Sequence, residues 1–353
     1  MLAPKAEDFS DAGAGYAVTR YDASGFLRLP FGLCDWLFFA RLIVREARAA
    51  GADGLLCNHW KHNLGFSAWL AARRLRIPYF VIAHGAEVNR PSRRVLDRWK
   101  RRLVYRGARR VFAVSDFTAG LVAGLGVPRE RIRVVGNGYD VRRVDAWRRQ
   151  QGGSGPTDVP DGDPVVLTVG RLEEHKGIDA VIEAMPVVRR SVPRARYVVV
   201  GDGPDRARLE SLVGRLGLGE CVRFAGYVSE EEKYAWYDRC DVFVLASRPL
   251  SDGSVEGFGI VFLEANAFGK PVIAGRSGGT ADAVLDGRTG LLVDPADVGA
   301  LSEALARLLT DPALARKLGA SGRERVVSDM SWLRQASRLA EAMRESPGGA
   351  AAR

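Results

Sequence analysis

Short apolar runs alternate with longer amphipathic segments along nearly the whole sequence. The runs at 79–83 and 165–169, for example, are mainly apolar and end at His84 and Gly170. Apolar strands separated by helices are typical of a parallel sheet that is covered on both faces. The sequence therefore predicts an α/β fold. Expected strands lie at 17–21, 54–57, 79–83, 110–114, 132–135, 165–169, 197–200, 222–225, 241–246, 272–274 and 290–293. Expected helices lie at 35–50, 66–75, 92–105, 178–190, 205–216, 230–237, 260–268, 297–309, 313–328 and 332–344.

One segment interrupts this alternation. Residues 150–162 are rich in Gly, Pro and Asp, which is typical of a linker between domains. A chain of 353 residues is long enough for two domains, each with its own core. We therefore expect two Rossmann-like domains with a cleft between them. The expected parts are an N-terminal domain at 1–145, a linker at 146–163, a C-terminal domain at 164–328, a helix at 329–345 that packs back toward the first domain, and a tail at 346–353.

The composition is that of a globular protein, because 47% of the residues are hydrophobic and 27% are charged. The most apolar expected helix is interrupted by Arg41 and is too short to span a bilayer. The cysteines form no CxxC pair, which predicts a reduced, cytoplasmic protein without a metal site. They are Cys34, Cys57, Cys221 and Cys240.

Positive charge is concentrated in the first part of the chain. Residues 1–150 carry 27 Lys and Arg against 13 Asp and Glu, a balance of +14, whereas the remainder has a balance of −4. Much of the excess lies between Arg93 and Arg110. One interpretation is an ordinary solvated helix, and another is a surface for anionic lipid at the inner face of the membrane. Nucleic acid is not expected, since few aromatic residues interleave with these arginines and no nucleic-acid motif is present.

Two carboxylates, Glu256 and Glu264, are joined by a glycine-containing turn and an apolar run. The pattern predicts a helix at 260–268 that ends before Gly269, with Glu256 in the preceding loop and Glu264 about one turn inside the helix. Free N–H groups at a helix start favour an anion such as a diphosphate, and carboxylates suit sugar hydroxyls. The alternative is a capped turn whose glutamates are merely solvated.

Two cations, Arg171 and Lys176, follow the first predicted strand of the second domain. Arginine offers a planar fork and lysine a point charge, and both suit a diphosphate. The alternative is a pair of surface cations in a loop. The carboxyl ends of strands are where open α/β sheets bind ligands, which favours a site at this edge.

Other loops follow predicted strands at the same sheet edge. They contain Gly201 with Gly203, Tyr227 with Val228, and Ser277 with Gly278 and Gly279. Backbone groups near Tyr227 are placed to meet the edge of a base. In the first domain, His84 ends the strand at 79–83 and is expected to face the cleft. A lone histidine is more often structural than catalytic, so both interpretations of His84 stay open.

The chain resembles glycosyltransferase family 4 in the order of its motifs, from residue 16 to residue 340. These motifs are Gly170-Arg171, Lys176-Gly177, Gly201-Asp202-Gly203, Glu256 with Glu264, and Ser277-Gly278-Gly279. Members of this family have the GT-B fold and transfer a sugar from a nucleotide-sugar with retention of configuration. Segments 255–265 and 271–279 are most similar to the bacterial phosphatidylinositol-mannoside mannosyltransferases.

The resemblance implies roles for individual residues. Arg171 and Lys176 hold the donor diphosphate, while Glu264 holds the ribose. Glu256 binds the transferred sugar, and His84 touches that sugar near the reacting carbon. Backbone amides from Phe258 to Ile260 assist the phosphate. The residues that complete the expected donor site are Gly170, Gly201, Gly203, Tyr227, Val228, Gly257, Phe258, Gly259 and Ile260.

The implied activity is transfer of a hexose, with mannose favoured, from a GDP- or UDP-linked donor to a lipid-linked or small-molecule hydroxyl. The first domain would bind the acceptor and the second the donor. No metal or other cofactor is expected, because Arg171, Lys176 and helix amides can carry the charge of the leaving group. Two alternatives are a nucleotide-sugar epimerase or hydrolase, and a non-catalytic protein that binds anionic lipid.

The family pattern also contains a first βα unit, with a Gly-Gly loop that contacts the donor phosphate and the acceptor. The segment before residue 16 does not contain this unit. We therefore expect the native product to begin upstream of Met1.

Overall fold

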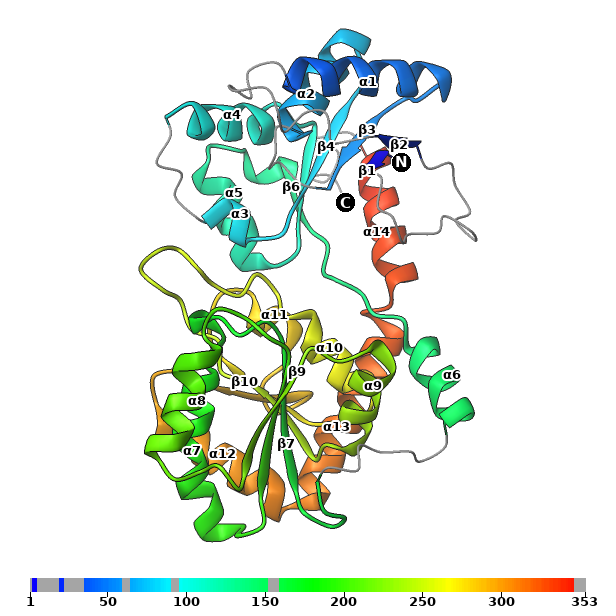
Figure 1. Cartoon of the computed structure of the whole chain (residues 1–353). Coiled ribbons are helices and arrows are strands. Elements are labelled where there is room, and N and C mark those ends of the chain that lie inside the picture. The colour runs from blue at the N-terminus through cyan, green and yellow to red at the C-terminus, as the bar shows by residue number, and fades with distance from the viewer. Residues whose placement is uncertain are drawn as a thin grey trace.

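The computed structural model describes residues 2–4, 19–21, 35–58, 64–89, 95–151 and 159–345. Two parallel sheets with helices on their faces form two lobes, an upper and a lower one in Figure 1. This arrangement confirms the predicted α/β fold. The tail at 346–353 and most of the predicted linker, 152–158, lie outside the described residues.

The sheet of the first lobe has the order β3-β4-β5-β6. Its strands are β3 (Leu55–Cys57), β4 (Tyr79–Ala83), β5 (Arg110–Ala113) and β6 (Ile132–Val134). All are parallel, with Val81 opposite Val111 at the centre. The strand expected at 17–21 is described as β2 (Thr19–Tyr21), which pairs with β1 (Leu2–Pro4) in a separate sheet.

Helices cover the first sheet because its strands are apolar on both sides. Val81 and Val111 pack with Val104 and Tyr105 of α4 (Val95–Arg106), all of them almost fully buried. The helices of this lobe are α1 (Asp35–Ala49), α2 (Leu64–Leu75), α3 (Ala86–Asn89), α4 (Val95–Arg106) and α5 (Asp116–Gly124). Ser115 caps α5 by accepting a hydrogen bond from the Thr118 amide.

The sheet of the second lobe has the order β12-β11-β10-β7-β8-β9, so the first strand in sequence is central. Its strands are β7 (Val165–Val169), β8 (Arg196–Val200), β9 (Val222–Gly226), β10 (Val242–Leu245), β11 (Val272–Gly275) and β12 (Gly290–Val293). The carboxyl ends of β7 and β10 lie at the switch point of this order, where open parallel sheets bind ligands.

Two layers of helices enclose the second sheet (Figure 1). One layer contains α7 (Ile178–Ser191), α8 (Arg206–Arg215) and α12 (Val298–Thr310). The other contains α6 (Val141–Gln151), α9 (Glu230–Arg239), α10 (Ile260–Ala267) and α13 (Pro312–Ser328). A short helix, α11 (Thr280–Ala283), follows β11. No helix in the described residues is long and apolar enough to cross a membrane.

Helix α6 is absent from the sequence prediction, which places the start of the linker at residue 146. In the structure, residues 141–151 form this helix, so it occupies the first part of the predicted linker. Its apolar face is held by tertiary contacts. The centre of the Trp147 ring lies 5.9 Å from the centre of the Phe268 ring and 6.1 Å from that of the Tyr234 ring. Helix α6 therefore packs against α9 and the end of α10 in the second lobe.

The last helix, α14 (Trp332–Arg344), runs from the second lobe beside the first one (Figure 1). Its Ala342 packs against Phe80 and Phe112 of the first sheet. Arg110, which is almost fully buried, donates hydrogen bonds to the Ala342 carbonyl and to Glu345. The C-terminal helix thus joins the two lobes a second time.

Candidate functional site

A cavity of about 420 Å³ is lined by residues of both lobes. His84 and Asn137, which follow β4 and β6, contribute from the first lobe. Lys176, Glu256 and the start of α10 contribute from the second. Of the predicted site residues, the structure brings together in this cavity His84, Lys176, Glu256, Gly257, Phe258, Gly259 and Ile260.

Close backbone contacts join the lobes beside this cavity. A Cβ atom at Gly85 would lie 2.9 Å from the Cα of Gly257, and one at Gly257 would collide with the carbonyl oxygen of His84. The Ser115 hydroxyl donates a 2.8 Å hydrogen bond to the Gly257 carbonyl. Glycine at both positions therefore allows the His84 loop to lie directly on the loop that carries Glu256.

Lys176 and Glu256 form an ion pair at the cavity wall. The lysine Nζ lies 2.7 Å from the Glu256 Oε2, and the side chains are only 19% and 13% exposed. Lys176 ends a short 3-10 turn, Glu174–Lys176, after β7, whereas Glu256 precedes α10. The cation that the sequence assigns to a diphosphate is thus neutralised by the carboxylate assigned to the sugar.

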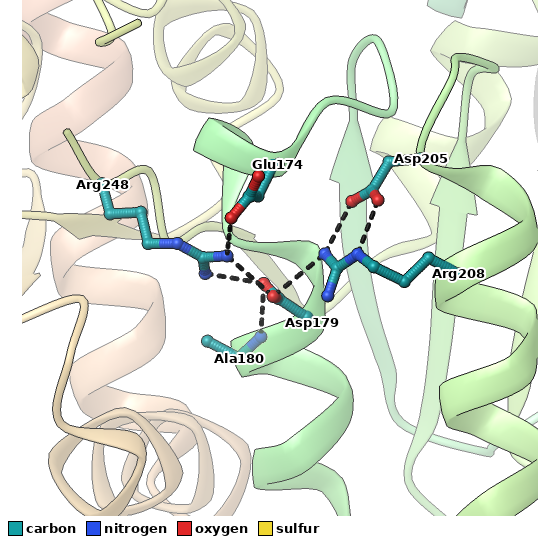
Figure 2. Close-up of polar contacts among 6 residues, drawn as sticks. All are labelled: Glu174, Asp179, Ala180, Asp205, Arg208 and Arg248. Atoms are coloured by element: carbon teal, nitrogen blue, oxygen red, sulfur yellow. Dashed lines mark hydrogen bonds and ion pairs between the residues drawn. The ribbon is translucent and has the colours of Figure 1, made fainter. Parts of the chain in front are cut away.

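A buried carboxylate anchors the turn that carries Lys176. Asp179, in the first turn of α7, accepts two 2.7 Å hydrogen bonds from Arg248 and one of 3.0 Å from Arg208, as Figure 2 shows. Arg208 also binds Asp205, and the backbone amide of Arg248 donates to the carbonyl of His175. Burial disfavours ionisation of Asp179, but the two guanidinium groups outweigh it and hold the pKa of Asp179 below its ordinary value.

Arg171 lies in a more open setting than Lys176. Its side chain is 69% exposed, and its Nε is 3.2 Å from the Glu173 Oε1. It is not among the residues that line the cavity. The structure therefore separates the two predicted diphosphate cations into a mostly buried lysine paired with Glu256 and an exposed arginine paired with Glu173.

Glu264 lies one turn inside α10, as predicted, but outside the lining of the cavity. Its Oε2 accepts a 2.8 Å hydrogen bond from the Tyr237 hydroxyl, and its Oε1 is 3.6 Å from the Lys233 Nζ. Burial and the charge of Glu264 raise the pKa of Tyr237 well above its ordinary value, so the tyrosine stays a donor. The two paired carboxylates therefore occupy different environments.

His84 is held at the end of β4 through both its backbone and its ring. Its amide donates a 2.6 Å hydrogen bond to the buried Glu87, and its Nε2 lies 2.9 Å from the carbonyl oxygen of Asn58. These contacts fix the imidazole at the cavity wall. The local fold therefore suits a positioned histidine better than one packed in a core.

The remaining predicted donor residues lie at neighbouring strand ends. Gly170 and Gly201 are linked to the sheet by backbone hydrogen bonds, and Gly203 follows in the same turn. The ring of Tyr227 is 92% exposed directly after β9, while Val228 packs against the core. None of these residues lines the 420 Å³ cavity, so their roles stay predictions.

Several cavity residues are absent from the sequence prediction, including Asn137, Glu173, His175 and Ser254. His175 is buried beside Lys176, with its Nδ1 3.4 Å from the Glu173 Oε2. The sequence could have indicated His175 as a site residue, because it lies between Arg171 and Lys176. Asp179 and Arg248 gave no signal, because a buried ion pair between residues 69 positions apart has no local pattern.

Comparison with known proteins defines the class. Residues 1–138 match the glycosyl transferase 4-like domain, and residues 154–325 match the glycosyl transferases group 1. Sucrose-phosphate synthase from Thermosynechococcus elongatus has a similar structure, with a TM-score of 0.73 and 27% identity over 93% of this chain and 82% of that one. HepE from Anabaena, solved with UDP, has a TM-score of 0.71 and 21% identity, covering 92% and 85%. The fold is therefore GT-B, and the chain is a glycosyltransferase.

Curated relatives define the family more narrowly. The chain is 37% identical to a GDP-mannose-dependent alpha-(1-6)-phosphatidylinositol monomannoside mannosyltransferase of Mycolicibacterium smegmatis, over 97% of this chain and 88% of that protein. It is 32% identical to the protein of the same description from Mycobacterium tuberculosis, over 96% and 86%. The chain belongs to glycosyltransferase family 4, as its motifs indicate.

Proposed function

We propose that this chain is a retaining mannosyltransferase that moves mannose from GDP-mannose to a hydroxyl of a phosphatidylinositol-mannoside lipid. The observation that carries the proposal is the 37% identity to such an enzyme over 97% of this chain, through both lobes. The sugar–phosphate bond breaks, and the diphosphate leaves with the bonding electrons. The acceptor oxygen bonds to the same carbon and loses its proton.

The diphosphate is the group whose charge grows as the bond breaks. Lys176, at the cavity wall, and Arg171, exposed nearby in sequence, are the cations proposed to bind it. Preorganised donors at the developing charge lower the barrier directly. The backbone amides at the start of α10, from Phe258 to Ile260, are proposed to add to this stabilisation. We propose that the reaction needs no metal or other cofactor.

The paired carboxylates are proposed to bind hydroxyl groups of the donor. Glu256 and His84 line the cavity and suit the transferred sugar, while Glu264 suits the ribose. Glu264 accepts a hydrogen bond from Tyr237 and lies 3.6 Å from the Nζ of Lys233, which orient its carboxylate. The base of the nucleotide is then proposed to bind near Gly201, Gly203, Tyr227 and Val228.

We propose that the enzyme works at the cytoplasmic face of the membrane through the basic helix α4. Val95, Leu96 and Trp99 are 69%, 53% and 52% exposed on this helix, next to the exposed Arg98 and Arg102. Exposed apolar side chains beside cations suit the boundary between lipid headgroups and acyl chains. A lipid-linked acceptor would be reached from this surface.

A donor panel tests the proposal. The purified protein is incubated with GDP-mannose, UDP-glucose or ADP-glucose, and with phosphatidylinositol or its monomannoside in vesicles. We expect a mannosylated lipid from GDP-mannose. NMR of this product should show that the new glycosidic bond keeps the α configuration of the donor. Transfer from UDP-glucose but not from GDP-mannose would contradict the proposed donor. Release of free sugar without an acceptor would favour a hydrolase.

A further inference from the structure

A second cavity, of about 540 Å³, lies in the first lobe. It is lined by Tyr79 at the start of β4 and by Arg109 and Arg131, which directly precede β5 and β6. These are the amino ends of the strands, whereas His84 follows the carboxyl end of β4. With about 3.3 Å per residue, the five residues of β4 separate the two cavities by more than 10 Å. The second cavity is therefore distinct from the donor site.

Four arginines line this cavity: Arg73, Arg76, Arg109 and Arg131. We call it the arginine pocket. Within the described ranges, no carboxylate forms an ion pair with any of these four side chains, and Arg73 instead lies 5.2 Å from the centre of the Trp69 ring. Other arginines of the chain, such as Arg110 and Arg248, are paired with acids. Like charges gathered without counter-charges repel one another, and a bound anion would relieve this repulsion.

The backbone at Arg76 supports a role in binding. Helix α2 ends at Leu75, and Arg76 follows with a φ of 57°. This left-handed conformation after a helix is usually taken by glycine, because other residues are strained there. An arginine at this position places a charge at the pocket despite the strain. Strained residues of this kind gather at ligand sites.

The shape of the pocket suits an organic anion. Its volume lies in the range of small-molecule sites, and Ile77, Pro78 and Ala72 give it an apolar wall. A Cβ at Gly107 would collide with the Nε1 of Trp69, so the absence of a side chain at Gly107 lets the indole form one side of the pocket. The indole and the guanidinium groups thus line the same space.

We propose that the arginine pocket binds a phosphate ester, because guanidinium groups bind phosphate oxygens in a bidentate manner. The ester is carried either by a lipid headgroup or by a soluble metabolite. The site is separate from the donor cleft and does not depend on the identity of the donor sugar.

Inorganic pyrophosphate is the first probe, added with saturating GDP so that the proposed diphosphate site of the donor cavity is already occupied, and tryptophan fluorescence and calorimetry are the readouts. We expect saturable binding that weakens as salt is added. Arg73→Ser with Arg109→Ser should weaken it by about tenfold or more, since charge-assisted hydrogen bonds are lost. Arg74→Ser with Arg316→Ser is the matched control, because both side chains are exposed and lie outside the pocket lining. Equal affinity of the two double variants would overturn the proposal.

Arg76→Gly separates binding from folding. Glycine removes the charge and adopts a φ of 57° without strain. This variant should therefore be at least as stable as the parent in thermal unfolding. We expect it nevertheless to bind pyrophosphate several-fold more weakly. Unchanged affinity in this variant would also overturn the proposal.

Vesicles distinguish the two sources of phosphate. If the ligand is a headgroup, phosphatidylglycerol vesicles should compete with pyrophosphate in the control variant, and phosphatidylcholine vesicles should not. If neither competes, while Arg73→Ser with Arg109→Ser still weakens pyrophosphate binding, the pocket takes a soluble phosphate ester.

Discussion

Lys176 donates a 2.7 Å hydrogen bond to Glu256, although the two residues lie 80 positions apart in the sequence. The pair joins the loop after β7 to the loop before α10 and lies at the wall of the interlobe cavity. A diphosphate that enters this cavity would compete with Glu256 for the lysine. Glu256 would then be released to accept hydrogen bonds from the sugar. The pair therefore links the two proposed binding roles.

Lys176→Ala should reduce turnover by about 10²–10³, the scale seen when one preorganised donor to a transition state is removed. Lys317→Ala on α13 is a suitable control, because Lys317 is exposed and does not line the cavity. Steady-state kinetics of sugar transfer give the comparison. If the double variant Arg171→Ala with Lys176→Ala kept full turnover, the diphosphate role of both cations would be wrong.

Much of the fold follows from the sequence alone. The predicted strands at 79–83 and 165–169 and the helix at 332–344 agree with β4, β7 and α14, because the strands are continuous apolar runs and the helix has an amphipathic period. Helix α6 has only a short apolar face, with Val144 and Trp147 buried among charged residues. Its position is decided by contacts with distant aromatic rings, which no local pattern contains.

The site follows from the sequence only in part. His84, Lys176 and Glu256 could be predicted because each stands beside a strand end or a helix start. The direct pairing of Lys176 with Glu256 could not be predicted, since it depends on how two loops meet in space. The clamp of Asp179 by Arg208 and Arg248 was missed for the same reason. The sequence therefore indicates which strand ends carry the chemistry but not which side chains meet there.

The two carboxylates should differ in their kinetic effects. Glu264→Gln should mainly weaken nucleotide binding, because a ribose contact is made equally in the ground state and the transition state. Glu256→Gln should lower kcat more than affinity, because its sugar contact tightens as the bond breaks. Tyr237→Phe is a matched control that removes the hydroxyl bonded to Glu264 while keeping the carboxylate. Identical kinetic signatures for the two glutamine variants would contradict this division of roles.

The Asp179 clamp should make stability depend on pH. Arg248 and Arg208 hold the pKa of Asp179 below its ordinary value in the folded protein, so the ionised carboxylate stabilises the fold above the unfolded pKa of about 3.9. Asp179→Asn should therefore lower the free energy of unfolding at neutral pH by about 1.5–3 kcal/mol, the range for hydrogen bonds to charged groups. The difference from the parent should shrink as the pH falls below about 4.

Urea unfolding at a series of pH values measures this dependence. Asp53→Asn serves as the control, because Asp53 is exposed. A difference between the parent and Asp179→Asn that stays constant down to pH values well below 4 would argue against an ionised clamp. Because the clamp also anchors the turn of Lys176, Asp179→Asn should lower turnover at neutral pH as well.

The contact between the lobes should be sensitive to one methyl group. Gly85 has a φ of 106°, and a Cβ there would lie 2.9 Å from the Cα of Gly257. Gly85→Ala should therefore displace the His84 loop and reduce turnover by about 10²-fold, since a shift of 1 Å at reacting groups has effects of this size. Nucleotide binding by the second lobe should remain. Gly120→Ala in α5, where a Cβ meets nothing within 4 Å, should leave turnover unchanged.

The last prediction concerns membrane binding through α4. Arg101, one of the arginines expected to face the lipid, donates a 3.0 Å hydrogen bond to the carbonyl of Val88, so its removal would also disturb the fold. Arg98 and Arg102 are exposed and give a cleaner test. Arg98→Ser with Arg102→Ser should weaken binding to anionic vesicles by about 1 kcal/mol per charge.

Trp99→Ser should weaken vesicle binding as well, but with less dependence on salt, because it removes apolar contact rather than charge. Arg316→Ser with Lys317→Ser on α13 removes the same charge from an exposed face of the second lobe and should have little effect. Sedimentation with phosphatidylglycerol vesicles at low and high salt gives the comparison, since exposed charges are screened within about 10 Å at 0.1 M salt. If the α4 and α13 variants lost vesicle binding equally, the attraction of the protein to anionic vesicles would depend on its net charge alone. Helix α4 would then be an ordinary solvated helix.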